Sequence, residues 1–381
     1  MIYLAFIMLG MANVLGSAWP AMHEQLGVLG ASGGLVFMII SGATILAALC
    51  CDQLARRVGS GKLVGLGLAL MAVALVGFSQ TTNFISLCLW SVPLGMGMGF
   101  VDATLNSVVA LHYQAKQMNW LHAFWGVGAS IGPIIMSFFL VWQNSWAAGY
   151  QFIGLLQLAF VASFFLTFKL WQPIQNCATN PETAQPEALS MKQVLTISGV
   201  KQSLLLFLCY TAIEATVGLW ASSYFVVVRQ LSQETAALWV ALYFGGITVG
   251  RFLAGFLSVK FSHKQLVNLG SALIGLGIML LLLPVAQPFL LVALFLIGFG
   301  CAPIFPSLIH ETPHNFGAHN AQAIIGMQMA FAYAGSMLMP PLFGLIATQI
   351  NYTLFPVYLG GFWLLMIIMI KWLSKKLASR T

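Results

Sequence analysis

Long apolar runs dominate this chain, and short polar stretches interrupt them at regular intervals. A segment of about 20 mostly apolar residues is long enough to cross a bilayer as a helix, and a helix satisfies its own backbone polar groups in lipid. The pattern therefore predicts an all-α membrane protein with twelve transmembrane helices. These helices are expected at residues 2–20, 32–51, 63–79, 84–111, 120–142, 147–171, 201–227, 235–258, 265–284, 289–310, 320–348 and 353–373.

One long polar stretch divides this pattern into two halves. Residues 172–199 contain three prolines and two glutamates among small and polar residues, which is typical of a linker. We therefore expect an N-terminal six-helix bundle at residues 1–171, a cytoplasmic linker at 172–199 and a C-terminal six-helix bundle at 200–381.

The two halves repeat one another. A shift of 203 residues places Gly67 on Gly270 and Gly97 on Gly300. Parallel repeats related by an axis along the membrane normal build the two halves of major facilitator transporters, which this pattern resembles. The repeat predicts two pseudo-symmetric bundles around a central cavity.

Composition and charge placement agree with this class. Hydrophobic residues make up 60% of the chain and charged residues 6%, whereas a soluble domain carries about 25% charged residues. The net charge is +7, but the basic residues gather in connections on one side, where the positive-inside rule puts the cytoplasm. Both termini are expected in the cytoplasm, and membrane lipid rather than nucleic acid is the expected partner. The basic residues in question are Arg56, Arg57, Lys62, Lys116, Lys169, Lys192, Lys201, Lys260, Lys264, Lys371, Lys375, Lys376 and Arg380.

The loop CCDQLARRVGSGK (residues 51–63) resembles the signature between helices 2 and 3 of the major facilitator superfamily, with Asp52, Arg56 and Arg57 in matching places. An acidic group at such a place can pair with a basic group or cap a helix N-terminus, and so latch a gate. We expect these three residues to act in gating, with Arg251 as their counterpart in the second half. A charge cluster that only sets the topology is the alternative.

An aspartate interrupts the apolar fourth helix. Asp102 and Asn106 are four residues apart and share one face of that helix. A carboxylate inside the membrane is costly, so it normally faces a cavity and has a function. Such a group is able to load and release a proton as the cavity alternates between the two sides. Asp102 is therefore a candidate for proton coupling and Asn106 for substrate binding; a structural buried carboxylate is the alternative.

Glu214 is the second carboxylate inside a predicted helix, within YTAIEATVGLWASSY (residues 210–224). Tyr210 precedes it by one turn, and Trp220 follows it by six residues, about 240° around the helix. Glu214 and Trp220 would line one cavity if the helix breaks near Gly218. We expect Glu214 to couple protons or bind substrate, and Tyr210 and Trp220 to bind substrate with it; a structural pair is the alternative for Glu214.

The fifth helix begins NWLHAFWGVG (residues 119–128) and presents His122 and Trp125 on one face. An indole ring offers a platform for the apolar face of a sugar, and an imidazole is able to bond a sugar hydroxyl. Packing or an interfacial position is the alternative for both. Further candidates for substrate binding are Asn13, Gln328 and Tyr333.

The sequence lacks the features of a nucleotide-driven pump or a metalloprotein. The phosphate-binding pattern GxxxxGK[ST] is absent, and the His and Cys residues show no spacing typical of a metal site. We expect no cofactor, no metal, no enzymatic activity and a monomeric protein.

Three motifs resemble the fucose:proton symporter family of the major facilitator superfamily. DATLN (residues 102–106) matches its helix 4, NWLHAFWGVG matches the start of its helix 5, and Asn13 matches its helix 1. The resemblance implies uptake of a sugar with a proton through the acid at position 102, in the inner membrane of a bacterial cell. Two positions depart from the family: Val14 stands where it has a second acid, and Trp125 stands where it has a cavity Asn.

The leading hypothesis is therefore a sugar:proton symporter that works by alternating access, with Asp102 as the coupling residue. Either Glu214 replaces the missing acid, or the coupling differs from that of the family. The alternative is a proton-coupled antiporter that exports lipophilic or drug-like compounds, because residues 128–133 carry half of the antiporter signature of helix 5. A sensor or lipid-handling scaffold is a third hypothesis, which the lack of a soluble domain in the sequence disfavours.

Overall fold

The computed structural model describes residues 1–112, 115–168, 191–258 and 260–378, and every regular element among them is a helix. Twelve segments of these residues are long and apolar enough to cross a membrane, which confirms the predicted number. The helices are α1 (Ile2–Met11), α2 (Leu15–Leu26), α3 (Ser32–Val58), α4 (Ser60–Ser79), α5 (Phe84–His112), α6 (Ala115–Gln143), α7 (Trp146–Leu166), α9 (Met191–Thr196), α10 (Val200–Arg229), α11 (Gln233–Leu257), α12 (His263–Leu282), α13 (Gln287–Cys301), α14 (Ile304–Phe316), α15 (Ala318–Gln349), η2 (Tyr352–Leu354) and α16 (Phe355–Ala378).

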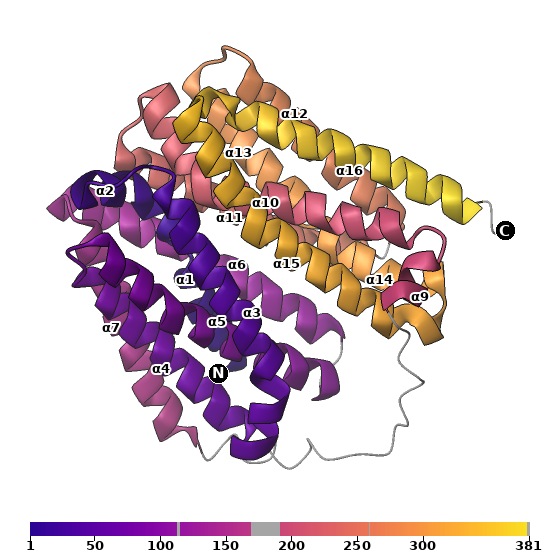
Figure 1. Cartoon of the computed structure of the whole chain (residues 1–381), viewed down its shortest axis with the longest axis horizontal. Coiled ribbons are helices and arrows are strands. Elements are labelled where there is room, and N and C mark those ends of the chain that lie inside the picture. Colours follow the sequence, from indigo (N-terminus) through magenta and orange to yellow (C-terminus); the bar gives the residue numbers. More distant parts are fainter. Residues whose placement is uncertain (113–114, 169–190, 259, 379–381) are drawn as a thin grey trace.

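The helices form two groups in space (Figure 1). Helices α1 to α7, coloured indigo to magenta, lie on one side, and α10 to α16, coloured red to yellow, lie on the other. Within the expected linker, residues 172–190 lie outside the described residues, and Met191–Thr196 form the short helix α9. We call the two groups the first and the second bundle.

The duplicated glycines mark equivalent helix crossings in the two bundles. A Cβ atom added at Gly67 of α4 would lie 2.8 Å from the carbonyl oxygen of Gly97 in α5, and one at Gly97 would lie 2.5 Å from that of Gly67. Gly270 of α12 and Gly300 of α13 face each other's carbonyl groups in the same way. Only a residue without a side chain lets two backbones approach so closely. The repeat in the sequence is thus a repeated crossing in the fold.

Two of the predicted spans are each built from two helices. The first span breaks between Met11 and Leu15, and the tenth breaks between Cys301 and Ile304. The seventh span, in contrast, is the continuous helix α10, so the break considered near Gly218 is absent from it. The break in the first span lies next to the interface between the bundles, and it places Asn13 there.

The bundles touch closely at the ends of the helices that lie away from the start of α1 and the end of α16. There a Cβ atom added at Gly34 of α3 would lie 2.7 Å from the Cα atom of Pro341 in α15. The hydroxyl of Ser137 in α6 donates a hydrogen bond to the backbone carbonyl of Glu234 in α11 at 2.8 Å. Figure 1 shows the bundles diverging toward the end that carries α9 and the end of α16. The arrangement is closed at one end, which we call the closed end.

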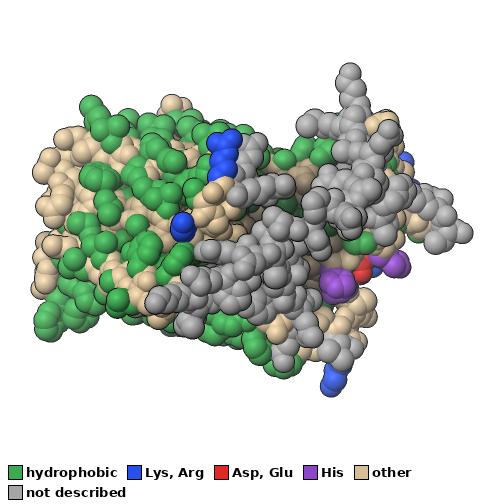
Figure 2. All heavy atoms as spheres, turned by 90° about the horizontal axis from the view of Figure 1, so that it is seen from below, with side chains coloured by type: hydrophobic (Ala, Val, Ile, Leu, Met, Phe, Trp, Pro, Cys, Tyr) green, Lys and Arg blue, Asp and Glu red, His purple; other side chains and the backbone are tan. Residues whose placement is uncertain are grey.

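Large apolar side chains remain exposed around the outside of both bundles, among them Ile85, Trp142 and Phe256. In Figure 2, hydrophobic side chains cover the left part of the face shown, and the charged side chains lie toward its middle and right. A soluble protein does not expose so many large apolar groups, whereas lipid tails cover them at little cost. The surface is therefore that of a multi-pass membrane protein.

Candidate functional site

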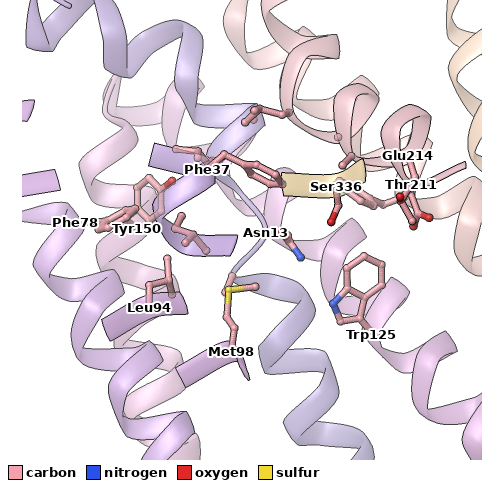
Figure 3. Close-up of a pocket in the computed structure, with 18 residues that line it drawn as sticks. Asn13, Phe37, Phe78, Leu94, Met98, Trp125, Tyr150, Thr211, Glu214 and Ser336 are labelled. Atoms are coloured by element: carbon pink, nitrogen blue, oxygen red, sulfur yellow. The ribbon is translucent and has the colours of Figure 1, made fainter. Parts of the chain in front are cut away.

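A cavity of about 280 Å³ lies between the two bundles (Figure 3). Most of its wall is apolar, and a few polar side chains interrupt that wall. Cavities of this kind bind small molecules, because the apolar wall excludes water and the polar groups select the ligand. The lining residues are Ala12, Asn13, Leu15, Gly16, Phe37, Ile40, Phe78, Leu94, Met98, Trp125, Tyr150, Thr211, Glu214, Ala215, Gly218, Leu219, Phe244 and Ser336.

Three residues expected from the sequence line this cavity: Asn13, Trp125 and Glu214. Asn13 lies in the break between α1 and α2, and Figure 3 shows its amide pointing into the space between Trp125 and Ser336. Trp125 comes from α6 of the first bundle and Glu214 from α10 of the second. The cavity thus brings together an amide, an indole and a carboxylate from both bundles.

Glu214 forms an ion pair with Arg251 of α11. The Arg251 Nη2 atom lies 3.5 Å from the Glu214 Oε1 atom, and the side chains are 15% and 19% exposed, respectively. The hydroxyl of Tyr243 donates a hydrogen bond to the backbone carbonyl of Glu214 at 3.0 Å. An ion pair that is largely removed from water depends on both partners, because loss of one leaves the other uncompensated.

Arg251 also reaches across to the first bundle. Its Nη1 atom donates a hydrogen bond to the His122 backbone carbonyl at 3.4 Å, and its Cζ atom lies 5.5 Å from the centre of the Trp125 ring. The imidazole of His122 packs edge-on against Phe6, with 5.9 Å between ring centres, and does not line the cavity. Arg251 lies six residues before the end of α11 at Leu257, inside the span rather than in a loop.

Asp102 and Asn106 are direct neighbours on α5, as their spacing predicts. The Asn106 Nδ2 atom donates hydrogen bonds to the Asp102 Oδ1 atom and to the Asp102 backbone carbonyl, each at 3.0 Å. Neither residue lines the cavity. Tyr333 of α15 is 39% exposed and does not line the cavity either. All three expected residues therefore lie outside the cavity wall.

Two aromatic candidates on α10 pack inside the second bundle instead of facing the cavity. Trp220 is completely buried, and its indole Nε1 donates a hydrogen bond to the Pro340 carbonyl at 2.7 Å. Tyr210 is 1% exposed, and its ring centre lies 6.2 Å from that of Phe305. Because α10 is unbroken, the angular offset of about 240° between Glu214 and Trp220 is retained, and the indole points away from the cavity.

Gln328 of α15 is completely buried and joins three helices of the second bundle. Its Nε2 atom donates a hydrogen bond to the Ser203 hydroxyl of α10 at 2.7 Å and to the Thr312 hydroxyl of α14 at 3.0 Å. It does not line the cavity. The side chain therefore holds the bundle together rather than meeting a ligand there.

We expect the substitution Gln328→Leu to lower the free energy of unfolding by about 1–3 kcal/mol, because Ser203 and Thr312 would lose a buried partner. Denaturant unfolding in detergent would measure this change. Gln349→Leu is the control, because Gln349 is exposed at the end of the same helix and its replacement should change stability by less than about 0.5 kcal/mol. Unaltered stability combined with weaker ligand binding in Gln328→Leu would instead assign this residue to a binding site.

Of the residues expected in gating, Arg57 is exposed near the end of α3. The side chains of Asp52 and Arg56 lie outside those that the structure describes. Within the described residues, no group of three or more His, Cys, Asp or Glu is arranged to hold a metal ion.

Several lining residues were missed from the sequence, above all Thr211, Tyr150 and Ser336. Thr211 precedes Glu214 by three residues, so the helical period alone indicates that it shares the face of that carboxylate. Tyr150 and Ser336 carry no such signal, because each lies in a different helix whose rotation is set by packing. Tyr150 is 1% exposed and packs its ring edge-on against Phe78, with 5.2 Å between ring centres.

Comparison with known proteins adds a family and several relatives. The sequence profile of the Major Facilitator Superfamily matches residues 1–320 and, in a second match, residues 202–380. Bypass of stop codon protein 6 of Saccharomyces cerevisiae is 23% identical over 92% of this chain and 77% of its own length. Glucose/mannose transporter GlcP of Bacillus subtilis is 25% identical over 68% of this chain and 65% of its own length. Quinolone resistance protein NorA of Staphylococcus aureus is 23% identical over 90% of this chain and 87% of its own length.

Proposed function

Since this chain belongs to the Major Facilitator Superfamily and is a secondary transporter rather than an enzyme, we propose that it carries a sugar or a similar small polar solute together with a proton. Transport would proceed by alternating access, in which residues 1–171 and 200–381 rock as two bundles about the cavity. The observation that carries the proposal is the carboxylate of Glu214 in the wall of that cavity, beside Asn13 and Trp125.

Glu214 is suited to proton coupling because it faces the cavity and is paired with Arg251 at 3.5 Å. A proton taken up by the carboxylate cancels its charge and weakens its hold on the guanidinium, so occupancy by a proton changes a contact between helices. Asp102, which accepts a hydrogen bond from Asn106, is proposed as a second residue that binds and releases the proton, outside the cavity wall.

Sugar recognition is supported by the chemistry of the remaining polar groups. The Trp125 indole offers a face on which a pyranose ring is able to stack, and the Asn13 amide offers both donors and an acceptor for its hydroxyls. The similarity to a glucose/mannose transporter of Bacillus subtilis agrees with a sugar as cargo.

The basic side chains support an orientation in the membrane. Lys62, Lys260 and Lys376 are exposed at the end of the bundles opposite the closed end, so we assign that end to the cytoplasm. The closed end, where Gly34 meets Pro341, then faces outward, and the cavity is in its inward-facing state. We propose a monomer in the inner membrane of a bacterial cell.

A proton-coupled exporter of lipophilic compounds is the second candidate, and one observation favours it. The cavity wall is mostly apolar and includes Phe37, Phe78 and Phe244. Such a wall would accept an aromatic drug-like molecule, and a quinolone resistance protein is among the relatives.

Proteoliposomes separate the two candidates. We expect glucose, mannose or galactose added outside right-side-out vesicles to raise the external pH, because a symporter removes a proton from the medium with each sugar. The signal should be lost in Asp102→Asn, which leaves a side chain of nearly the same shape that cannot ionise, and partly kept in Asp102→Glu. Silence toward every sugar, together with proton-driven efflux of a dye from the same vesicles, would refute the symport proposal and support the exporter.

A further inference from the structure

Arg251 connects the carboxylate of Glu214 with the indole ring of Trp125. From α11 in the second bundle it contacts the carboxylate of Glu214 on α10 and the backbone and ring of two residues on α6. The nitrogen–oxygen distances are 3.5 Å to Glu214 and 3.4 Å to the His122 carbonyl, both at the long end of the hydrogen-bond range. Hydrogen bonds of this length are weak, so neither of them holds the guanidinium in one place.

Two side chains of the opposite bundle contact the Trp125 ring. Arg251 lies over the ring at 5.5 Å from its centre, within the range of a cation–π contact, and Phe244 meets it edge-on with 6.1 Å between ring centres. Both neighbours come from α11, whereas Trp125 itself comes from α6. The indole lines the cavity beside Asn13 (Figure 3). The affinity for a ligand that stacks on this ring therefore depends on the position of Arg251.

Neutralising Glu214 changes what Arg251 must do. A guanidinium whose counter-charge is lost inside the protein is costly, so it moves to the partners that remain. Those partners are the His122 carbonyl and the face of Trp125, which both belong to α6. A proton on Glu214 would then strengthen the Arg251–Trp125 contact, hold the indole in place and draw α6 and α11 together.

We infer that Arg251 is the positioning residue that makes ligand binding depend on the protonation of Glu214, because it exchanges between that carboxylate and the Trp125 ring. This inference rests on the proposed function. Coupling between two sites is reciprocal. A proton on Glu214 would therefore raise the affinity for the ligand by the same factor by which the bound ligand raises the affinity of Glu214 for the proton. The ligand class follows from the platform: a neutral molecule with an apolar ring face, such as a pyranose, stacks on the indole without competing for Arg251.

Other titratable groups face this pair and must be separated from it. They are Tyr210 of α10, Tyr243 of α11, Cys301 of α13 and, next to Arg251, the imidazole of His122 on α6. Among them, the histidine has the ordinary pKa closest to neutrality, so it is the one able to mimic a pH effect of Glu214. The variant His122→Gln therefore belongs in the test.

The test is the affinity of purified protein for radiolabelled glucose, mannose and galactose between about pH 5.5 and 8.5. For the wild type we expect the affinity to rise as the pH falls, by a factor of about 5 to 150 over the range. Arg251→Gln should lose this dependence to within about twofold. Arg251→Lys keeps the charge, but it should also lose most of the pH dependence. An ammonium group lacks the planar, forked shape with which a guanidinium contacts the carboxylate and the ring together.

Arg229 provides the matched control. It lies in the same bundle, with its Cζ atom 5.9 Å from the Tyr224 ring centre and a 2.9 Å bond from its Nη2 atom to the Leu281 carbonyl, but outside the cavity lining. Arg229→Gln and His122→Gln should both keep the pH dependence. A full dependence in folded Arg251→Gln or Arg251→Lys would overturn this inference and leave the proposed function intact. A wild type that binds no sugar, or binds it equally at every pH, would overturn both.

Discussion

Glu214→Gln is expected to abolish uphill accumulation of the sugar and to leave only movement down its own gradient. The substitution keeps the shape of the side chain in the cavity but removes its ability to bind and release a proton. Without that exchange, a proton gradient cannot drive the cargo. The measurement is the steady-state ratio of labelled sugar inside and outside proteoliposomes with an imposed pH gradient, which should fall to about one, the value of an uncoupled carrier.

The same substitution should also destabilise the protein, since Arg251 would keep its charge without the partner that lies 3.5 Å away. Breaking a buried pair in this way costs about 3–5 kcal/mol, and the true value should be lower here because both side chains retain some exposure. The double variant Glu214→Gln/Arg251→Gln should recover most of the stability and none of the accumulation. This comparison separates coupling from folding.

Glu311→Gln is the control for Glu214→Gln, because Glu311 lies on α14 and does not line the cavity. It should accumulate sugar like the wild type. Normal accumulation by Glu214→Gln would show that this carboxylate is not the coupling group and would leave Asp102 in that role.

Gly34→Val is expected to stop transport by holding the closed end open. A Cβ atom at this position would lie 2.7 Å from the Cα atom of Pro341 and 3.2 Å from its Cβ atom, so α3 and α15 would be forced apart. Overpacking costs about 1–3 kcal/mol, which shifts the balance away from the closed state about 5- to 150-fold. Uptake should fall, and a cysteine placed at Phe37 in the cavity wall should react faster with a membrane-impermeant thiol reagent applied at the closed end.

Gly42→Val on the same helix is the matched control, because no atom of the residues that the structure describes lies within 4 Å of a Cβ atom added there. It carries the same change in helix propensity without the contact, so uptake and labelling should resemble those of the wild type. If Gly34→Val transports normally and its labelling rate is unchanged, the contact with Pro341 is not part of a closing gate.

The number and approximate limits of the membrane spans could be predicted from the sequence, because burial in lipid imposes a length of apolar residues that tertiary contacts do not alter. The repeated helix crossings could be predicted from the glycines for a similar reason. Gly67 with Gly97, and Gly270 with Gly300, permit backbone approaches that any side chain would block, so the spacing of the residues already reflects the crossing. The pairing of Asp102 with Asn106 follows from helical geometry alone.

The candidate site depended on the tertiary structure. Glu214 and Arg251 are 37 residues apart on different helices, and only the packing of α10 against α11 makes them an ion pair. The unbroken path of α10 buries Trp220 against Pro340, and the break in the first span brings Asn13 to the cavity. The sequence alone shows which polar residues lie inside the membrane, because the cost of burying a polar side chain in lipid depends only on its own position in an apolar span. The rotation of each helix decides which of those residues meet, and it is set by contacts between helices far apart in the sequence.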